Sequence, residues 1–223
     1  QTMPSPAQTR FVLTGNAAAY PYDEFYKNDD ELTADIVAAY RQVIADLYAA
    51  GCRNIQFDDC TWGMIVDDKY WAAKVGDGFT LKDEAEKYLK VNNLAIEGKP
   101  DDLTITTHVC RGNYHSTYAS KGAYDAVAPY LFAKENADAF YLEFDDERSG
   151  GFEPLKYVSD NKKVVLGLIT TKSPVLENKE TVIARIKEAA KYIPLDRLYL
   201  SPQCGFASCE IGNKLTAEQQ WAK

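Results

Sequence analysis

Two periodic patterns of apolar residues alternate along the chain: in one they recur every three or four positions, and in the other at every second position. Residues 35–51 place apolar side chains every three or four positions, which predicts an amphipathic helix. The stretch NIQFDD, at 54–59, alternates apolar and polar residues and predicts a short strand. A second helix is predicted at about 81–97, with Thr80 as its N-cap. The first half of the chain therefore reads as helix, strand and helix in turn.

The second half continues this alternation. Strands are predicted at LTITTHV, AFYLEF, VVLGLIT and RLYLSPQCG, and helices at about 123–134, 154–158 and 180–193. RFVLTG, at 10–15, is a further strand candidate near the N-terminus. Strands that alternate with helices predict a parallel sheet in which crossover helices join the strands.

Two architectures fit this alternation: an open doubly wound sheet and a (β/α)8 barrel. No strand is followed by G-x-G-x-x-G or G-x-x-x-x-G-K-[ST], the phosphate-binding sequences of nucleotide-binding open sheets. In a barrel, the C-terminal ends of the strands meet at one mouth, where the active site lies. Reactive residues stand at such ends here: Asp58 and Asp59, His108 and Cys110, Glu143, and Cys204. We therefore predict the C-terminal portion of a (β/α)8 TIM barrel, with its first strands missing from this chain and one domain over 1–223.

The charge balance and the cysteines narrow the classes of partner. The chain has 25 Lys and Arg against 33 Asp and Glu, a net charge of −8, which argues against nucleic acid or an anionic membrane as partner. No apolar run approaches the roughly 20 residues of a membrane span, and no signal-peptide pattern opens the chain. Five cysteines without disulfide-like spacing fit free thiols and a cytoplasmic location. The oligomeric state is not indicated.

His108 and Cys110 form the sharpest chemical signal. Residues two apart on a strand point to the same face, so both side chains can reach one ion. An imidazole and a thiolate suit Zn²⁺, and Glu143 and Cys204 are the natural further ligands because they end later strands. The alternative is that the cysteine is a small buried apolar group and the histidine a structural one. Cys60 is an additional thiol near the predicted mouth, with buried packing as its alternative.

Three short sequences carry a family resemblance when taken in order. HVC after one strand, a glutamate that ends a later strand, and SPQCGF after the last strand resemble the C-terminal catalytic barrel of cobalamin-independent methionine synthase, especially the shorter methionine-synthase-II-like proteins. The resemblance covers essentially the whole chain. It implies that zinc is bound by four residues: His108, Cys110, Glu143 and Cys204. It further implies that Asp58, in NIQFDD, binds the amino group of homocysteine.

The resemblance also implies an activity. The expected reaction is zinc-dependent transfer of a methyl group from 5-methyltetrahydrofolate, with a polyglutamate tail, to the homocysteine thiol, which gives methionine. Zinc would hold the sulfur in its reactive anionic form, since the thiolate is the nucleophile. Arg111, directly after the H-x-C motif, is a candidate to bind a substrate carboxylate or the folate glutamates, with loop capping as the alternative.

The sequence departs from the family in three places. Asp58-Asp59-Cys60 stands where the family usually has D-E-P, and FDDERSGG, with Arg148, replaces a short T-S-R-S. The family's histidine that is proposed to protonate the leaving folate nitrogen should lie near TTKSP. Lys172 occupies the position before Ser173, so Lys172 is the candidate catalytic proton donor, with His115 as the alternative.

Three other functions stay open from the sequence. The first is a related zinc thiol methyltransferase with a different donor, such as a corrinoid, or a different acceptor. The second is a metal-free acid/base barrel hydrolase that uses Asp58 and Glu143 as paired carboxylates, which leaves the histidine and both cysteines without a role. The third is a non-catalytic remnant, because an incomplete barrel exposes edge strands.

Overall fold

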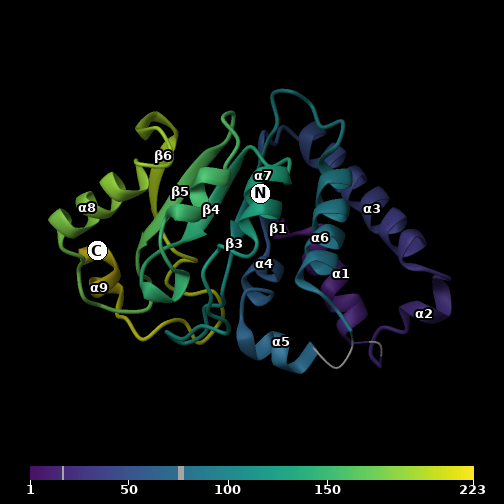
Figure 1. Ribbon diagram of the computed structural model, residues 1–223, viewed down its shortest axis with the longest axis horizontal. Helices are drawn as coiled ribbons and strands as arrows, with labels where there is room; N and C mark the ends of the chain where they lie inside the picture. Colours follow the sequence, from purple (N-terminus) through teal and green to yellow (C-terminus); the bar gives the residue numbers. More distant parts are fainter. Residues whose placement is uncertain (17, 75–77) are drawn as a thin grey trace.

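The protein is built on a layer of parallel strands with helices packed against it, as the computed structural model shows for residues 1–16, 18–74 and 78–223 (Figure 1). Six strands hydrogen-bond in the order β1-β2-β3-β4-β5-β6, which is also their order along the chain. Their bounds are Thr2–Pro4 (β1), Asn54–Asp58 (β2), Thr104–Val109 (β3), Ala139–Glu143 (β4), Lys163–Ile169 (β5) and Leu198–Pro202 (β6).

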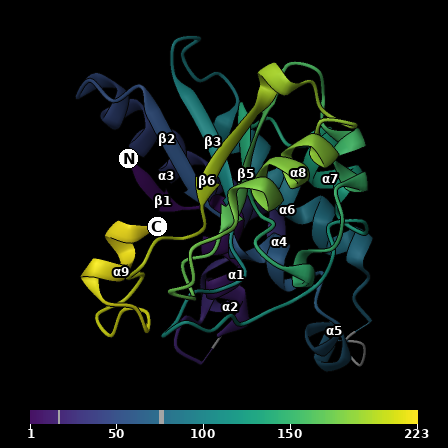
Figure 2. The same cartoon turned by 90° about the vertical axis from the view of Figure 1, so that its left-hand side faces the viewer.

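This strand order decides between the two predicted architectures. A doubly wound sheet reverses its strand order at a switch point, whereas the strands of a (β/α)8 barrel follow the chain. All five neighbouring pairs are parallel, so the barrel-type prediction is confirmed and the doubly wound sheet is excluded. Over the described residues the sheet is not closed, and β1 and β6 are its two edges (Figure 2).

Helices join the strands and pack on one another. Helix α3 packs on α6, and α6 packs on α7 (Figure 1). Within the described ranges, no helix combines the length and the apolar character that crossing a bilayer requires. The helices are α1 (Pro6–Gly15), α2 (Tyr22–Phe25), α3 (Asp29–Ala49), α4 (Cys60–Met64), α5 (Asp68–Lys74), α6 (Leu81–Ile96), α7 (Ala128–Lys134), α8 (Lys179–Ala189) and α9 (Ala217–Ala222), with short 3-10 turns at Glu147–Ser149, Glu153–Tyr157 and Leu195–Arg197.

The alternation in β2 and β3 gives the sheet two different faces. Ile55 and Phe57 are fully buried in the hydrophobic core, whereas Gln56 and Asp58 are partly exposed on the other face. In β3 the same alternation buries every second residue and leaves His108 partly exposed. Asp58 pairs in register with His108, so the polar side chains of neighbouring strands lie side by side. The polar face of the strand ends is where the candidate chemistry gathers.

Two element predictions are corrected by the structure. RFVLTG is not a strand: it belongs to helix α1, because Ser5 accepts a hydrogen bond from the Gln8 N–H and Pro6 opens the first turn. The first strand is instead Thr2–Pro4. The helix expected over 123–134 begins only at Ala128, with a proline in its first turn.

A network of buried polar groups lies among the helices and the outer face of the sheet. Glu135, 0% exposed, accepts hydrogen bonds from Thr107 Oγ1 and from Trp62 Nε1, the latter at 3.1 Å. Burial, followed by the charge of the nearby Asp59 carboxylate, raises the pKa of Glu135 from 4.5 to about 7. Asp59 is itself buried and accepts a hydrogen bond from Asn92 Nδ2 at 2.9 Å. Between about pH 4.5 and 7 the folded chain therefore keeps a proton on Glu135 that the unfolded chain has already released.

This proton makes stability depend on pH. Because the pKa of Glu135 is raised on folding, its contribution is most favourable below about pH 5 and is lost as the pH rises through about 7. We expect Glu135→Gln to remove about 2–3 kcal/mol of the loss in unfolding free energy between pH 5 and 8. Urea unfolding of both proteins at pH 5, 6, 7 and 8 measures this difference.

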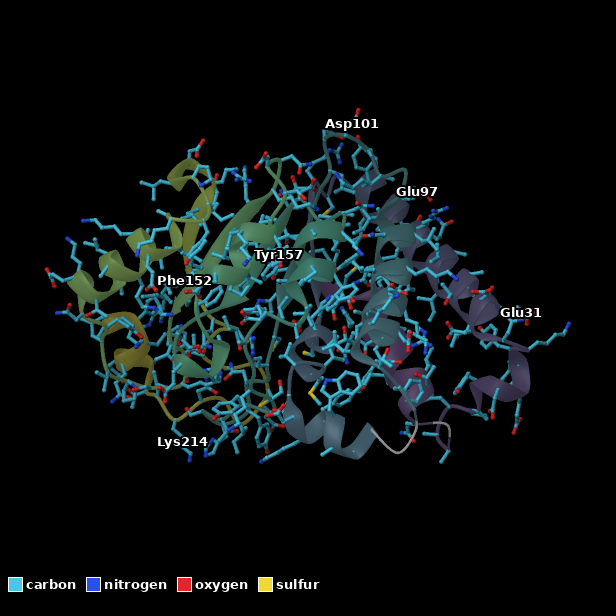
Figure 3. All side chains as sticks on the ribbon, in the orientation of Figure 1. Glu31, Glu97, Asp101, Phe152, Tyr157 and Lys214 are labelled. Carbon is cyan, nitrogen blue, oxygen red and sulfur yellow. The ribbon has the colours of Figure 1, made fainter. Side chains whose placement is uncertain are left out.

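The matched control for this prediction is Glu97→Gln. The Glu97 side chain is 68% exposed and lies at the surface of the helical layer (Figure 3). Its replacement should leave the wild-type pH profile of unfolding in place. Parallel profiles for wild type and Glu135→Gln would show that the Glu135 carboxyl does not titrate differently on folding.

Candidate metal centre

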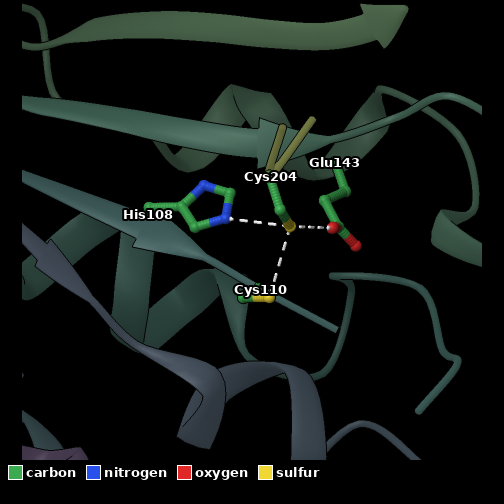
Figure 4. A group of neighbouring side chains, drawn as sticks. All are labelled: His108, Cys110, Glu143 and Cys204. Carbon is green, nitrogen blue, oxygen red and sulfur yellow. Dashed lines mark hydrogen bonds between the residues drawn. The ribbon is translucent and has the colours of Figure 1, made fainter. Parts of the chain in front are cut away.

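Four side chains from three strand ends meet at one point. Cys204 Sγ lies 3.4 Å from Cys110 Sγ, 3.4 Å from His108 Nε2 and 3.1 Å from Glu143 Oε1 (Figure 4). One ligand atom from each of the four residues lies within 4.8 Å of every other. The structure thus brings together the four residues that the sequence nominated as metal ligands; that role stays a prediction.

Local backbone geometry delivers each of these side chains. His108 is in β3 and Glu143 is the last residue of β4, so the parallel register aligns their ends. Cys110 follows β3, and its Sγ accepts the Gly112 N–H at 3.2 Å. Gly112 has a φ of +93°, where an added Cβ would collide with Ala119, so glycine suits this turn.

Cys204 lies in the loop after β6, which is an edge strand of the sheet. It follows β6 by two residues, and the Gln203 N–H donates to the Ile169 carbonyl at 3.1 Å, which ties the start of this loop to β5. The next segment is also fastened: Asn113 Nδ2 donates to the Gly205 carbonyl at 2.8 Å. The loops after β3 and β6 therefore hold each other, and this contact fixes Cys204 over Cys110.

The two central thiols influence each other strongly. The hydrogen bond from Cys204 lowers the pKa of the Cys110 thiol, and a second hydrogen bond from Cys60 lowers it further. The same contact with Cys110 raises the pKa of the Cys204 thiol. Although burial alone would lower it, the pKa of His108 is raised by the Cys110 hydrogen bond. The cluster thus concentrates negative charge on sulfur, which is the property of a site for a soft cation.

The donor set fits a tetrahedral zinc ion. Zinc in proteins takes cysteine sulfur, histidine nitrogen and carboxylate oxygen at about 2.0–2.3 Å, which separates neighbouring ligand atoms by roughly 3.3–3.8 Å. The three separations measured from Cys204, 3.1–3.4 Å, are close to that range. The donor types of the four residues and the three separations from Cys204 therefore fit a zinc ion.

Glu143 is the most enclosed member of the cluster. It is 0% exposed, and its Oε2 accepts a hydrogen bond from Arg148 Nη2 at 3.4 Å. Its backbone N–H donates to the Tyr124 hydroxyl at 3.1 Å. That hydroxyl in turn accepts a hydrogen bond from Arg111 Nη1 at 2.7 Å. Two arginines therefore support Glu143, one through the carboxylate and one through the tyrosine.

A cavity of about 430 Å³ opens beside the cluster. Asp58 lines it, and Asp58 Oδ1 is buried without a hydrogen-bond partner among the described residues. Burial, followed by the charge of Cys110, raises the pKa of Asp58 to about 6. Cys60, Asp58 and Cys110 offer ligand atoms within 4.8 Å of one another, so Cys60 also belongs to this region. The lining residues come from all six strands or the loops after them: Thr2, Gln56, Asp58, His108, Cys110, Asn113, Tyr141, Leu142, Glu143, Gly167, Ser201, Pro202, Gln203, Cys204 and Ser208.

Two nominated residues lie apart from the residues that line this cavity. Arg111 is 1% exposed and donates to Tyr124 and to the Gly122 carbonyl, the latter at 2.7 Å. These two hydrogen bonds tie the Arg111 guanidinium into the protein interior. Lys172 Nζ donates to Gln203 Oε1 at 3.3 Å, and Gln203 lines the cavity. Lys172 is therefore one residue removed from the cavity wall.

Three residues that support the centre were not predicted from the sequence. Tyr124, which bridges Arg111 and Glu143, follows no strand and lies in no motif. Gln203 was only the neighbour of Cys204, yet its Oε1 accepts from Thr170 Oγ1 at 3.2 Å. Arg148 was visible as a departure from the family sequence, but its contact with Glu143 depends on how the loop after β4 folds back.

The fold and the centre together define a class of protein. The strands of the parallel sheet follow the chain order, and cysteine, histidine and glutamate side chains gather at the strand ends. These features are those of an α/β-barrel protein with a candidate metal centre. Residues 8–219 match the family described as "Cobalamin-independent synthase, Catalytic domain". The chain belongs to this family, which confirms the resemblance found in its sequence.

Several known proteins are similar to the chain. "Uncharacterized protein YxjG" of Bacillus subtilis (strain 168) is 49% identical over 200 residues, covering 89% of this chain and 53% of that protein. The crystal structure of a putative vitamin-B12 independent methionine synthase from Listeria monocytogenes matches with 38% identity and a TM-score of 0.73, covering 100% of this chain and 59% of that one. Methionine synthase of Saccharolobus solfataricus is 24% identical over 198 residues, 88% of this chain and 51% of that protein. The chain spans about half the length of the curated relatives it matches.

Proposed function

We propose that this chain forms part of a zinc-dependent methyltransferase that moves a methyl group from 5-methyltetrahydrofolate, with a polyglutamate tail, to the thiol of homocysteine. The product is methionine. The observation that carries the proposal is the convergence of His108, Cys110, Glu143 and Cys204 on one point. Membership of the cobalamin-independent synthase family supports the same reaction class. We also infer that residues 1–223 belong to one domain, because one hydrophobic core runs from α1 to α8.

The four side chains, which all line the cavity, would hold the metal at its wall. When bound, a zinc ion supplies the positive charge that keeps a neighbouring thiol ionised at neutral pH. Cys110 and Cys204 provide the sulfur ligands, and His108 and Glu143 complete the set. Because Glu143 and Cys110 are buried, bulk water is kept away from the part of the cluster that these two side chains form.

Asp58 is proposed to bind the amino group of homocysteine. Its carboxylate lines the same cavity as the two ligand cysteines, and its Oδ1 is buried without a partner among the described residues. An ammonium group would satisfy this oxygen with a charge-assisted hydrogen bond. An amino acid bound there would place its side-chain sulfur toward the cluster.

Which methyl donor the protein can use depends on whether a residue can protonate the leaving group. A tertiary amine such as the methylated folate nitrogen leaves poorly unless it is protonated, whereas a corrinoid leaves without a proton. We propose Lys172 as the proton donor, because its Nζ lies 3.3 Å from Gln203 Oε1 on the cavity wall. The lysine in place of the family's histidine is also the feature that favours the alternative, a corrinoid methyl donor.

A two-donor assay tests the proposal. We expect the zinc-loaded protein to form methionine from homocysteine and methyltetrahydrofolate triglutamate, measured by mass spectrometry. Lys172→Met should slow this transfer by about 100-fold, the range of general acid catalysis, and leave transfer from methylcobalamin unchanged.

The other outcomes are equally informative. Activity only with methylcobalamin would replace the folate donor by the corrinoid alternative. Absence of methionine with both donors would contradict the proposed acceptor or reaction. The metal-free hydrolase is disfavoured, because the two oxygens of Glu143 already contact Cys204 Sγ and Arg148 Nη2, and because this reaction leaves the histidine and both cysteines of the cluster without a role.

A further inference from the structure

The two oxygens of Glu143 face different partners. Oε1 lies in the metal cluster, 3.1 Å from Cys204 Sγ, and Oε2 lies 3.4 Å from Arg148 Nη2. The Arg148 side chain is only 4% exposed, so this contact is made away from bulk water. We propose that Arg148 is a positioning residue that keeps Glu143 a weak, replaceable metal ligand; this inference rests on the proposed function.

Arg148 is held in place by more carboxylates than it can neutralise. Its Nη2 lies 2.9 Å from Asp145 Oδ1, and its Nη1 contacts Asp146. The Tyr118 ring covers the guanidinium at 5.0 Å. With Glu143 included, three carboxylates surround one guanidinium, which stays charged at any ordinary pH. This anchoring fixes the cation against Oε2 of Glu143.

A cation on the outer oxygen weakens the inner one as a ligand. Partners of a metal ligand set its basicity: a carboxylate behind a histidine raises it, and a guanidinium behind a carboxylate lowers it. The contact also occupies Oε2, so Glu143 offers the metal a single oxygen. Both effects favour replacement of Glu143 by an incoming sulfur.

Arg148 also stabilises the released form of Glu143. A buried carboxylate that left the metal without another partner would be strongly disfavoured. Because Arg148 already contacts Oε2, the negative charge of Glu143 stays paired after release. Loss of Arg148 should therefore make Glu143 hold the metal more tightly, which is the opposite of what loss of a merely structural side chain would do.

The test is the zinc affinity of Arg148→Met, measured by competition with a chromophoric chelator and zinc alone as the probe. Because the variant lacks a buried positive charge that repels the metal and attracts Glu143, we expect zinc to bind at least about 10-fold more tightly than in wild type. In cobalt-substituted protein, the homocysteine concentration needed to change the thiolate charge-transfer bands should rise by a similar factor. Arg148→Lys, which keeps the charge, should restore both values toward wild type.

Arg185→Met is the matched control. Arg185 donates to the Phe144 carbonyl, next to Glu143 in the chain, so this hydrogen bond goes to the backbone and not to the Glu143 carboxylate. Removing this guanidinium should leave the zinc affinity within about 2-fold of wild type, as for a cation outside the ligand's own contacts. Equal tightening in both variants would assign the effect to general charge and overturn the role of Arg148.

A second variant keeps the inference testable if Arg148→Met does not fold. Asp145→Asn removes the carboxylate that shares Nη2 of Arg148 with Glu143, so the guanidinium should bind Glu143 more strongly and zinc affinity should fall. Unchanged or weaker zinc binding in Arg148→Met, or tighter binding in Asp145→Asn, overturns the inference alone. A wild-type protein that binds no zinc overturns the proposed function as well.

Discussion

Replacing Cys204 with serine is expected to lower the affinity for zinc by more than about 100-fold, because loss of a direct ligand exceeds the 10- to 100-fold effect of losing a ligand's partner. Cys204 Sγ contacts all three other members of the cluster, at 3.1–3.4 Å. A serine hydroxyl is a poor zinc ligand and reaches less far. Metal analysis after gel filtration should fall from about one zinc per chain to a trace.

Cys209→Ser is the control for this variant. Cys209 is a free, partly buried cysteine five positions further along the same loop, and it does not belong to either group of possible ligands. Its replacement should leave the zinc content at the wild-type level. Zinc that persists at full occupancy in Cys204→Ser would show that the four side chains do not share an ion.

Gly63→Ala is expected to damage the centre from outside it. A Cβ at Gly63, in helix α4, would lie 2.3 Å from the Cys110 carbonyl oxygen and 3.2 Å from Arg111 Cγ. The carbonyl is backbone and cannot turn aside, so the end of β3 would have to shift. We expect the free energy of unfolding to fall by about 1–3 kcal/mol, as for other overpacked sites. Because Cys110 moves with its carbonyl, zinc affinity should fall by about 10-fold, as when a ligand loses its orientation.

Chemical denaturation and chelator competition measure the two effects of Gly63→Ala. Gly15→Ala is the control, because a Cβ at the end of helix α1 meets no atom within 4 Å. The control should leave zinc binding unchanged and stability equal or slightly higher, since alanine is the better helix residue. Wild-type zinc affinity in Gly63→Ala would show that the approach of α4 does not position Cys110.

The elements with strong periodic patterns were predictable, and those decided by single capping residues were not. Helix α6 has the predicted N-cap, Thr80, whose side chain accepts the Asp83 N–H, and it ends at Ile96 as its pattern indicates. RFVLTG was misassigned because its apolar run fits strand and helix equally. Ser5 and Pro6, just upstream, decided for helix.

The candidate ligands were predictable for a reason that the supporting residues do not share. Ligands stand at strand ends, and parallel register brings strand ends together, so His108, Cys110 and Glu143 could be placed by topology alone. Tyr124 and Arg148 reach Glu143 through loops whose paths depend on long-range packing. No local pattern encodes such a contact.

The sequence by itself determined the alternation of strands and helices, the donor types of the centre and the family resemblance, because periodicity and residue chemistry are properties of short segments. Only the tertiary structure decided that Arg111 supports Tyr124, that Arg148 contacts the outer oxygen of Glu143, and that Cys60 lies beside Cys110. These are side-chain contacts between segments that fold back on each other. Their distances follow from the packing of the whole core rather than from any one stretch of the chain.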